Sequence, residues 1–164
     1  MNPLSSDHRM HRTFRAGLAL CAAILAFQSP AVHAAPEAVR TIATPHRFGE
    51  LQEKLEQAVA THKMAVVAAA SASKGAAARG VTIPGNAVVM VFRNDYAVRM
   101  LEASVPAGIE APLRFYLTEN ADGTATLSWH TPSRTFAPYG SAKLDEMARD
   151  LDPIFEAIAR DASR

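Results

Sequence analysis

The sequence contains few of the residue types on which several kinds of protein chemistry depend. Its 164 residues include a single Cys, and aromatic side chains make up only 7% of the chain. One Cys excludes a disulfide framework and any zinc or iron–sulfur site built from cysteines. Charge is also nearly balanced, with 17 Lys and Arg against 16 Asp and Glu. The composition therefore lacks the positive excess that neutralises the phosphates of a nucleic acid.

The N-terminus has the parts of a secretory signal peptide. A basic segment with three Arg precedes an apolar run of 12 residues (16–27), and small residues lead up to a cleavage site after Ala34. The apolar run is too short for a helix that spans a membrane, which takes about 20 residues. We therefore expect residues 1–34 to be a cleaved signal peptide and residues 35–164 to be a single domain exported to the periplasm.

Removal of the expected signal peptide changes the composition of the chain. It takes away three Arg and one Asp, which leaves 14 basic and 15 acidic residues and a net charge of −1. The only Cys is lost, and of six His only His46, His62 and His130 remain. The mature chain therefore has no thiol chemistry, and no later apolar run is long enough for a membrane helix. We expect no nucleic-acid partner, no membrane contact after cleavage and no cofactor.

The mature sequence alternates between strand and helix patterns. Apolar residues recur at helical spacing in some segments and alternate or run continuously in others. Strands are predicted at 38–43, 64–70, 87–92, 113–118 and 124–130, and helices at 48–62, 74–80, 95–105 and 144–158.

Three details refine this pattern. The strand at 87–92 is apolar throughout, which predicts a central strand buried on both faces. The apolar run 64–70 indicates a buried strand, although Ala has a low strand propensity. Asp122-Gly123 marks a tight hairpin turn between the last two strands. Pro153 is expected to bend the last helix or to separate two helices. The order of the elements predicts an α+β domain in which helices pack on one face of an antiparallel sheet.

Several segments, taken in order, resemble the bacterial domain-of-unknown-function 302 family. They are Val91-Phe92-Arg93-Asn94, Val105-Pro106-Ala107-Gly108, Ala111-Pro112-Leu113-Arg114-Phe115, Glu119-Asn120-Ala121-Asp122-Gly123 and Trp129-His130-Thr131-Pro132. The resemblance extends from about Val39 to Ala159. It implies a TATA-binding-protein-like fold with a β-α-β(4)-α arrangement, a tendency to dimerise and no established activity.

The chain departs from the family pattern at two places. Many relatives carry an Asp-His pair where Ser71-Ala72 stand here, and a His near the position of Ala137-Pro138-Tyr139-Gly140. If those His residues bind a ligand, a metal or haem in the relatives, this chain lacks them.

The polar side of the predicted hairpin is the candidate ligand-binding site. Its members are polar or aromatic residues of the hairpin and of the loop that follows it: Arg114, Tyr116, Trp129, His130 and Tyr139. Arg and aromatic side chains are enriched where proteins bind ligands and partners. Arg114 would supply positive charge for an anion or another small molecule, and Tyr116 would supply a flat wall. The competing interpretation, which base rates favour, is a dimer interface across the same face of the sheet or a plain solvated surface.

The motifs for catalysis are incomplete. Ser71 and Lys74 have the Ser-x-x-Lys spacing of some hydrolases, but the accompanying Ser-Asp-Asn and Lys-Thr-Gly motifs are absent. His130 has no second ligand at a spacing suited to a metal, and His46 and His62 are interpreted as structural. We therefore predict no catalytic residue and no metal site. The predicted function is binding of a small ligand or a periplasmic protein, as a homodimer. The alternative is a haem- or redox-associated accessory protein in which His130 binds haem.

Overall fold

The computed structural model describes residues 39–164, so the expected signal peptide lies outside the described residues. The strands are β1 (Arg40–Arg47), β2 (Ala65–Ala70), β3 (Asn86–Phe92), β4 (Leu113–Glu119) and β5 (Thr124–Trp129). The helices are α1 (Phe48–Thr61), α2 (Ala72–Ala77), α3 (Asn94–Ala103), α4 (Pro132–Phe136) and α5 (Ala142–Ala162), and two 3-10 turns are η1 (Val105–Glu110) and η2 (Ala137–Tyr139).

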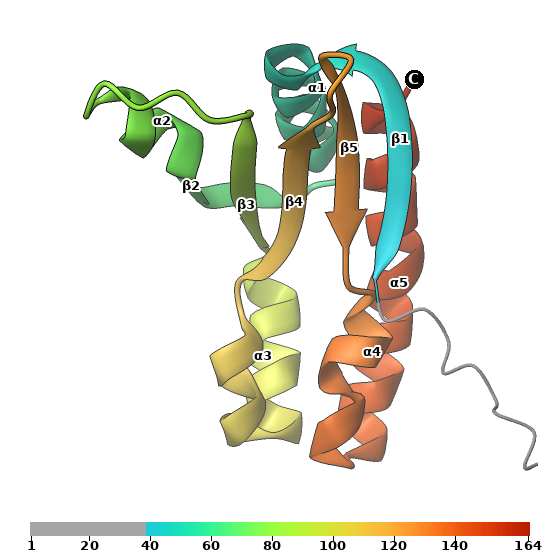
Figure 1. Cartoon of the computed structure of the whole chain (residues 1–164). Helices are drawn as coiled ribbons and strands as arrows, with labels where there is room; N and C mark the ends of the chain where they lie inside the picture. The colour runs from blue at the N-terminus through green and yellow to red at the C-terminus, as the bar shows by residue number, and fades with distance from the viewer. Residues whose placement is uncertain (1–38) are drawn as a thin grey trace, which may run out of the picture. The chain divides into compact units, whose positions relative to one another are not determined.

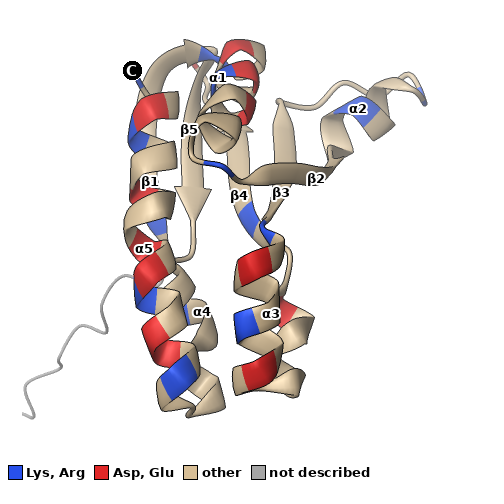
Figure 2. Ribbon diagram, turned by 180° about the vertical axis from the view of Figure 1, so that it is seen from behind, with Lys and Arg blue, Asp and Glu red and all other residues tan. Residues whose placement is uncertain are grey.

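The five strands form one antiparallel sheet in the order β1-β5-β4-β3-β2, so β1 and β2 are its edges. Helices α1 and α5 lie behind the sheet in Figure 1 and in front of it in the reverse view of Figure 2. This arrangement confirms the predicted α+β class with an antiparallel sheet. Within residues 39–164, no helix is long and apolar enough to cross a membrane.

The core lies between the sheet and the two long helices. Side chains alternate along β4, where Leu113, Phe115 and Leu117 are buried while Arg114 and Tyr116 are exposed. The Phe115 ring stacks on Phe155 of α5 at a centroid distance of 5.0 Å and lies 6.0 Å from the ring of Trp129. The period of two along the strand therefore separates an apolar face under the helices from a polar face on the other side.

The hairpin turn between β4 and β5 is formed as predicted. Gly123 has a φ of +79°, and its N–H donates to the carbonyl of Asn120 at 2.9 Å. A positive φ is free of steric cost only for glycine, which explains why the turn needs this residue. The Asp122 carboxylate accepts hydrogen bonds from the backbone N–H and the hydroxyl of Thr124, which lowers the pKa of Asp122.

Three predictions about the elements need correction. β3 is buried on one face only, with alternate residues partly exposed, whereas its apolar run predicted burial on both faces. All six residues of β2 are exposed, whereas the apolar run predicted a buried strand. β2 forms an edge of the sheet, and within residues 39–164 it pairs only with β3, so no described strand lies along its outer side. The 3-10 turns η1 and η2 and the short helix α4 have no counterpart in the sequence prediction. Of the two expectations for Pro153, the separation into two helices is wrong, because α5 continues through it.

A hydrogen-bonded His–Asp pair joins the C-terminal ends of α1 and α5. The Nε2 atom of His62 lies 2.8 Å from Oδ2 of Asp161, and this hydrogen bond lowers the pKa of the Asp161 carboxyl. A carboxyl group with a lowered pKa contributes stability above its unfolded-state pKa of about 3.9, and this contribution is lost as the pH falls through the folded-state value. The pair therefore stabilises the fold at neutral pH and not in strong acid.

We expect Asp161→Asn to lower the urea midpoint slightly at pH 7, with a difference from wild type that shrinks below about pH 4. Urea denaturation followed by circular dichroism between pH 3 and pH 7 measures this difference. Glu53→Gln, at an exposed position of α1, is the control for loss of one surface carboxylate. A difference between Asp161→Asn and wild type that is constant over this pH range would contradict the assigned hydrogen bond.

Candidate functional site

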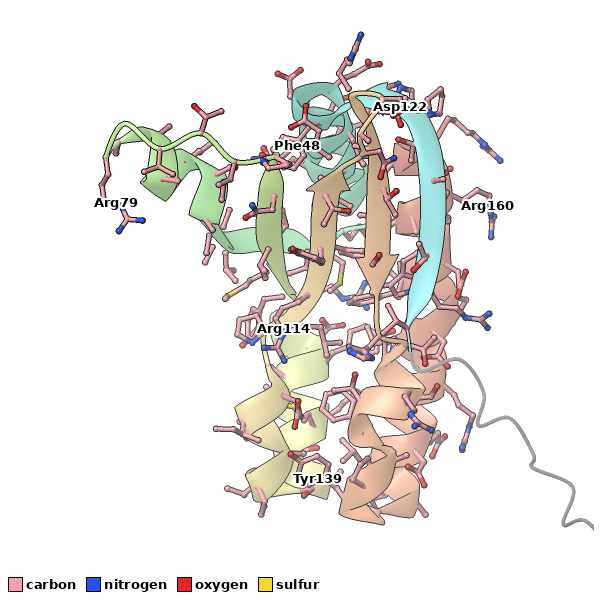
Figure 3. All side chains as sticks on the ribbon, in the orientation of Figure 1. Phe48, Arg79, Arg114, Asp122, Tyr139 and Arg160 are labelled. Atoms are coloured by element: carbon pink, nitrogen blue, oxygen red, sulfur yellow. The ribbon has the colours of Figure 1, made fainter. Side chains whose placement is uncertain are left out.

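The strand register brings the predicted polar residues into adjacent rows on the uncovered face of the sheet. Tyr116 of β4 is paired with Val88 of β3 on one side and with Ser128 of β5 on the other. Arg114 lies two residues before Tyr116 and therefore points to the same face. Figure 3 shows the Arg114 side chain at the lower end of the sheet, on the side that faces the viewer.

These rows border a groove with a volume of about 420 Å³. Its lining combines charged, aromatic, hydroxyl and apolar side chains from four segments of the chain: Val39, Val88, Arg114, Tyr116, Ser128, Trp129 and His130. Pockets that hold small molecules have volumes of roughly 300–1,000 Å³ and a few polar groups among apolar ones. The groove therefore has the size and the mixture of groups for a small ligand.

The charge of Arg114 is only loosely paired. Its Nη2 atom lies 3.9 Å from Oε2 of Glu110, which is longer than a hydrogen bond, and 56% of the Arg114 side chain is exposed. The other carboxylate oxygen of Glu110 accepts a 2.9 Å hydrogen bond from the hydroxyl of Tyr139. Burial raises the pKa of Tyr139, and the contact with Glu110 raises it further, so the phenol stays protonated. Glu110 thus stands between Tyr139 and the guanidinium of Arg114.

Two of the five predicted site residues are not on the polar face. Trp129 borders the groove but is only 3% exposed, and its ring packs in the core near Phe115, on the side of β5 opposite to Ser128. The side-chain alternation along β5 requires this inward position. Tyr139 lies among the lower ends of the helices in Figure 3, away from Arg114, and does not line the groove. It touches the site only through Glu110.

The three remaining His residues have separate positions. His130 is exposed and lines the groove, at the point where β5 ends. His46 is buried on β1, and its Nδ1 lies 2.9 Å from Oε1 of Glu50 in the first turn of α1. His62 pairs with Asp161 as described above. Among residues 39–164, no three His, Cys, Asp or Glu side chains are grouped in a way that could hold a metal ion.

The Ser-x-x-Lys pair has a structural role in the fold. The Ser71 hydroxyl accepts a hydrogen bond from the backbone N–H of Lys74 and lies 2.9 Å from the hydroxyl of Ser73. A hydroxyl in this position caps the N-terminus of the short helix α2. The spacing of Ser71 and Lys74 is therefore explained by helix capping.

A second cavity lies between α3, α5 and the end of β3. Its volume is about 30 Å³, and most of its lining is apolar, including Met64, Met100 and Met147. This volume matches about two water molecules. The cavity is therefore far smaller than the groove and too small for a metabolite.

Four residues of the site are not among those that the sequence predicts. Val39, Val88 and Ser128 line the groove, and Glu110 faces Arg114. The alternation of β5 indicates that Ser128 lies on the polar face, but only the register of three strands shows which residues stand side by side. Glu110 precedes β4 in the turn η1, and no local pattern in the sequence marks its approach to Arg114.

The comparisons with known proteins agree with this fold. The crystal structure of an uncharacterized conserved protein, DUF302, from Bacillus stearothermophilus is similar with a TM-score of 0.70 at 18% identity. The match covers 79% of this chain and 100% of that chain, and at this identity it shows the fold alone. No curated protein matches the sequence. The sequence profile described as "Domain of unknown function DUF302" matches residues 40–160, so the chain belongs to the DUF302 family.

Proposed function

We propose that this protein is a non-catalytic periplasmic binding protein that holds a small anionic ligand in the groove of the uncovered sheet face. The observation that carries the proposal is the loosely paired guanidinium of Arg114 beside Tyr116 in a groove of about 420 Å³. A guanidinium presents donors in a planar fork that matches a carboxylate or a phosphate. Tyr116, which is 45% exposed, adds an aromatic wall, and Ser128 adds a hydroxyl.

Binding of inorganic phosphate, sulfate and a set of small aliphatic and aromatic carboxylates tests this proposal. Thermal-shift screening of the purified protein, followed by titration calorimetry of each positive compound, measures the affinity. We expect at least one carboxylate or phosphate compound to raise the melting temperature and to bind in a way that weakens with added salt. Absence of a shift from any anion, with neutral analogues binding equally well, would overturn it.

The periplasmic location and the homodimer are parts of the same proposal. Export is supported by the basic and apolar segments that precede Ala34, and a mass of the mature chain that begins at Ala35 would establish it. A homodimer is supported by the short apolar strand that the fold leaves exposed at one edge of the sheet. Light scattering over a dilution series measures the oligomeric state.

The haem-associated alternative makes a different prediction with the same protein. His130 would be the axial ligand, since it is the His that lines the groove. An absorption spectrum recorded after haem addition distinguishes the two functions: a Soret change that disappears in His130→Ala favours haem, and an unchanged spectrum favours the anion.

Glu110 gives a further prediction for the anion site. Its carboxylate faces Arg114 and competes with an anionic ligand for the guanidinium. We expect Glu110→Gln to tighten anion binding about 1.5- to 5-fold, because an exposed ion pair contributes about 0.2–1 kcal/mol. The amide oxygen of Gln can still accept the hydrogen bond from Tyr139.

Calorimetric titration of the same anion into both proteins measures the effect of Glu110→Gln. Glu53→Gln serves as control, because it removes the same charge from α1 on the other side of the sheet. Weaker binding in Glu110→Gln would show that Glu110 assists the ligand rather than competing with it.

A further inference from the structure

The two edges of the sheet differ in their protection against pairing with another strand. β1 carries Arg40, Pro45 and Arg47, and these residue types keep an edge from accepting a further strand. β2 consists only of Ala and Val, and all six of its residues are exposed. An edge that carries neither charge nor proline is a template for a second strand.

The uncharged surface extends beyond the strand itself. No charged residue occurs from Met64 to Ser73, and Figure 2 shows β2 without any blue or red segment. Four exposed large apolar side chains belong to β2 and to the loop that returns from α2: Val66, Val67, Val81 and Ile83. Exposed apolar side chains that gather on one segment of a protein mark a surface that contacts another molecule.

From these observations we infer that β2 is the edge at which two copies of this chain pair, antiparallel and across a two-fold axis, so that the sheet continues through the dimer. This inference rests on the proposed homodimer and adds the location of its interface. A two-fold axis places the same strand on both sides, so that each copy offers the other the same small side chains. Six paired residues exchange about six backbone hydrogen bonds.

The charges at the ends of the segment fit a second copy. Lys63 and Lys74 flank the uncharged stretch on either side. When Ala65 of one copy stands opposite Ala70 of the other, Lys63 faces Ala72 and neither Lys faces a Lys. A foreign strand with acidic or basic side chains would find no opposite charge within the paired segment, whereas a second copy needs none. In charge, the edge of β2 therefore fits a second copy of β2 better than a strand that carries charged side chains.

The pairing of β2 with β3 is irregular at one point. The pairing with β3 shifts register between Val66 and Ala68, so Val67 forms a bulge and is 50% exposed. A bulge increases the local twist of a strand. Figure 1 shows β2 crosswise to the other strands, with α2 projecting beyond it. The twisted strand therefore presents its outer edge at the side of the sheet away from α5.

A matched pair of substitutions tests the inference. Ala68 and Ala43 are exposed Ala residues on the two opposite edge strands, β2 and β1. We expect wild type and Ala43→Lys to be dimers, and Ala68→Lys to raise the dimer dissociation constant at least 10-fold, because the two-fold axis brings two like charges together. Light scattering coupled to size exclusion, over a dilution series of the purified protein, measures this. Circular dichroism melts confirm that both variants are folded.

Hydrogen exchange supplies a measurement that needs no substitution. We expect amides 65–70 to exchange more slowly at high protein concentration than at low concentration, while amides 40–47 do not change. A wild-type chain that stays monomeric at all concentrations would overturn the homodimer and this inference together. A wild-type dimer that Ala68→Lys leaves intact, or that Tyr116→Lys dissociates instead, would overturn only the placement at β2.

Discussion

Replacement of Phe115 by Ala is expected to lower the free energy of unfolding by about 3–5 kcal/mol. Phe115 is fully buried at the centre of β4. The centre of its ring lies 5.0 Å from that of Phe155 and 6.0 Å from that of Trp129, which belong to two other elements. Its removal takes away apolar burial and leaves a cavity that the two rings cannot fill without leaving their own positions. Domains of this size have a total stability of about 5–15 kcal/mol, so the loss is a large part of it.

Chemical denaturation of Phe115→Ala and of wild type measures the loss, and the melting temperature should fall by about 10–25 °C. Tyr116→Ala is the control, because it removes an aromatic ring from the next residue of the same strand. Tyr116 points to the uncovered face and is 45% exposed, so we expect a loss of less than about 1 kcal/mol. If the Tyr116 variant were the less stable of the two, the assignment of the two faces of β4 would be wrong.

This contrast between neighbouring residues is also the part of the fold that the sequence predicts best. Strict alternation from Leu113 to Leu117 and the Asp122-Gly123 turn are local patterns, and the structure confirms the hairpin that they predict. The amphipathic stripes of α1 and α5 are local in the same sense. Their residue spacing alone determines which side faces the sheet.

The wrong prediction that β2 is buried arises because burial depends on contacts with distant segments, not on a local pattern. A continuous apolar run indicates a buried strand only if other elements cover it, and the order of strands in a sheet depends on contacts between distant segments. The run 64–70 therefore predicts a strand correctly and its burial wrongly. The small size of Ala contributes to the error, because an exposed Ala side chain presents little apolar surface to water.

The sequence also predicts one part of the candidate site and misses another. Arg114, Tyr116 and His130 share a face because of the period of two, and the structure places all three at the groove. Trp129 follows the same rule to the opposite face, so its ring is buried in the core although the residue borders the groove. Tyr139 and Glu110 lie on turns, where no periodicity relates a side chain to the sheet.

Loss of the Arg114 guanidinium is the second large effect that we expect. Arg114→Ala should weaken binding of the anion found by screening about 10-fold or more, because a hydrogen bond to a charged group contributes about 1.5–3 kcal/mol. The lower end of this range applies, since 56% of the Arg114 side chain is in contact with solvent. Arg114→Lys keeps the charge but loses the planar fork of donors, so we expect a smaller reduction of about 2- to 5-fold.

Titration calorimetry at two salt concentrations distinguishes a charge that contacts the ligand from one that only shapes the groove. Binding to wild type should weaken as salt is added, and binding to Arg114→Ala should lose most of this dependence, because the screened interaction is absent. Arg160→Ala is the matched control: Figure 3 shows Arg160 on α5, directed away from the sheet, and its removal should leave affinity and salt dependence unchanged. Equal losses in Arg114→Ala and Arg160→Ala would indicate a general effect of net charge, and the anion site at Arg114 would have to be abandoned.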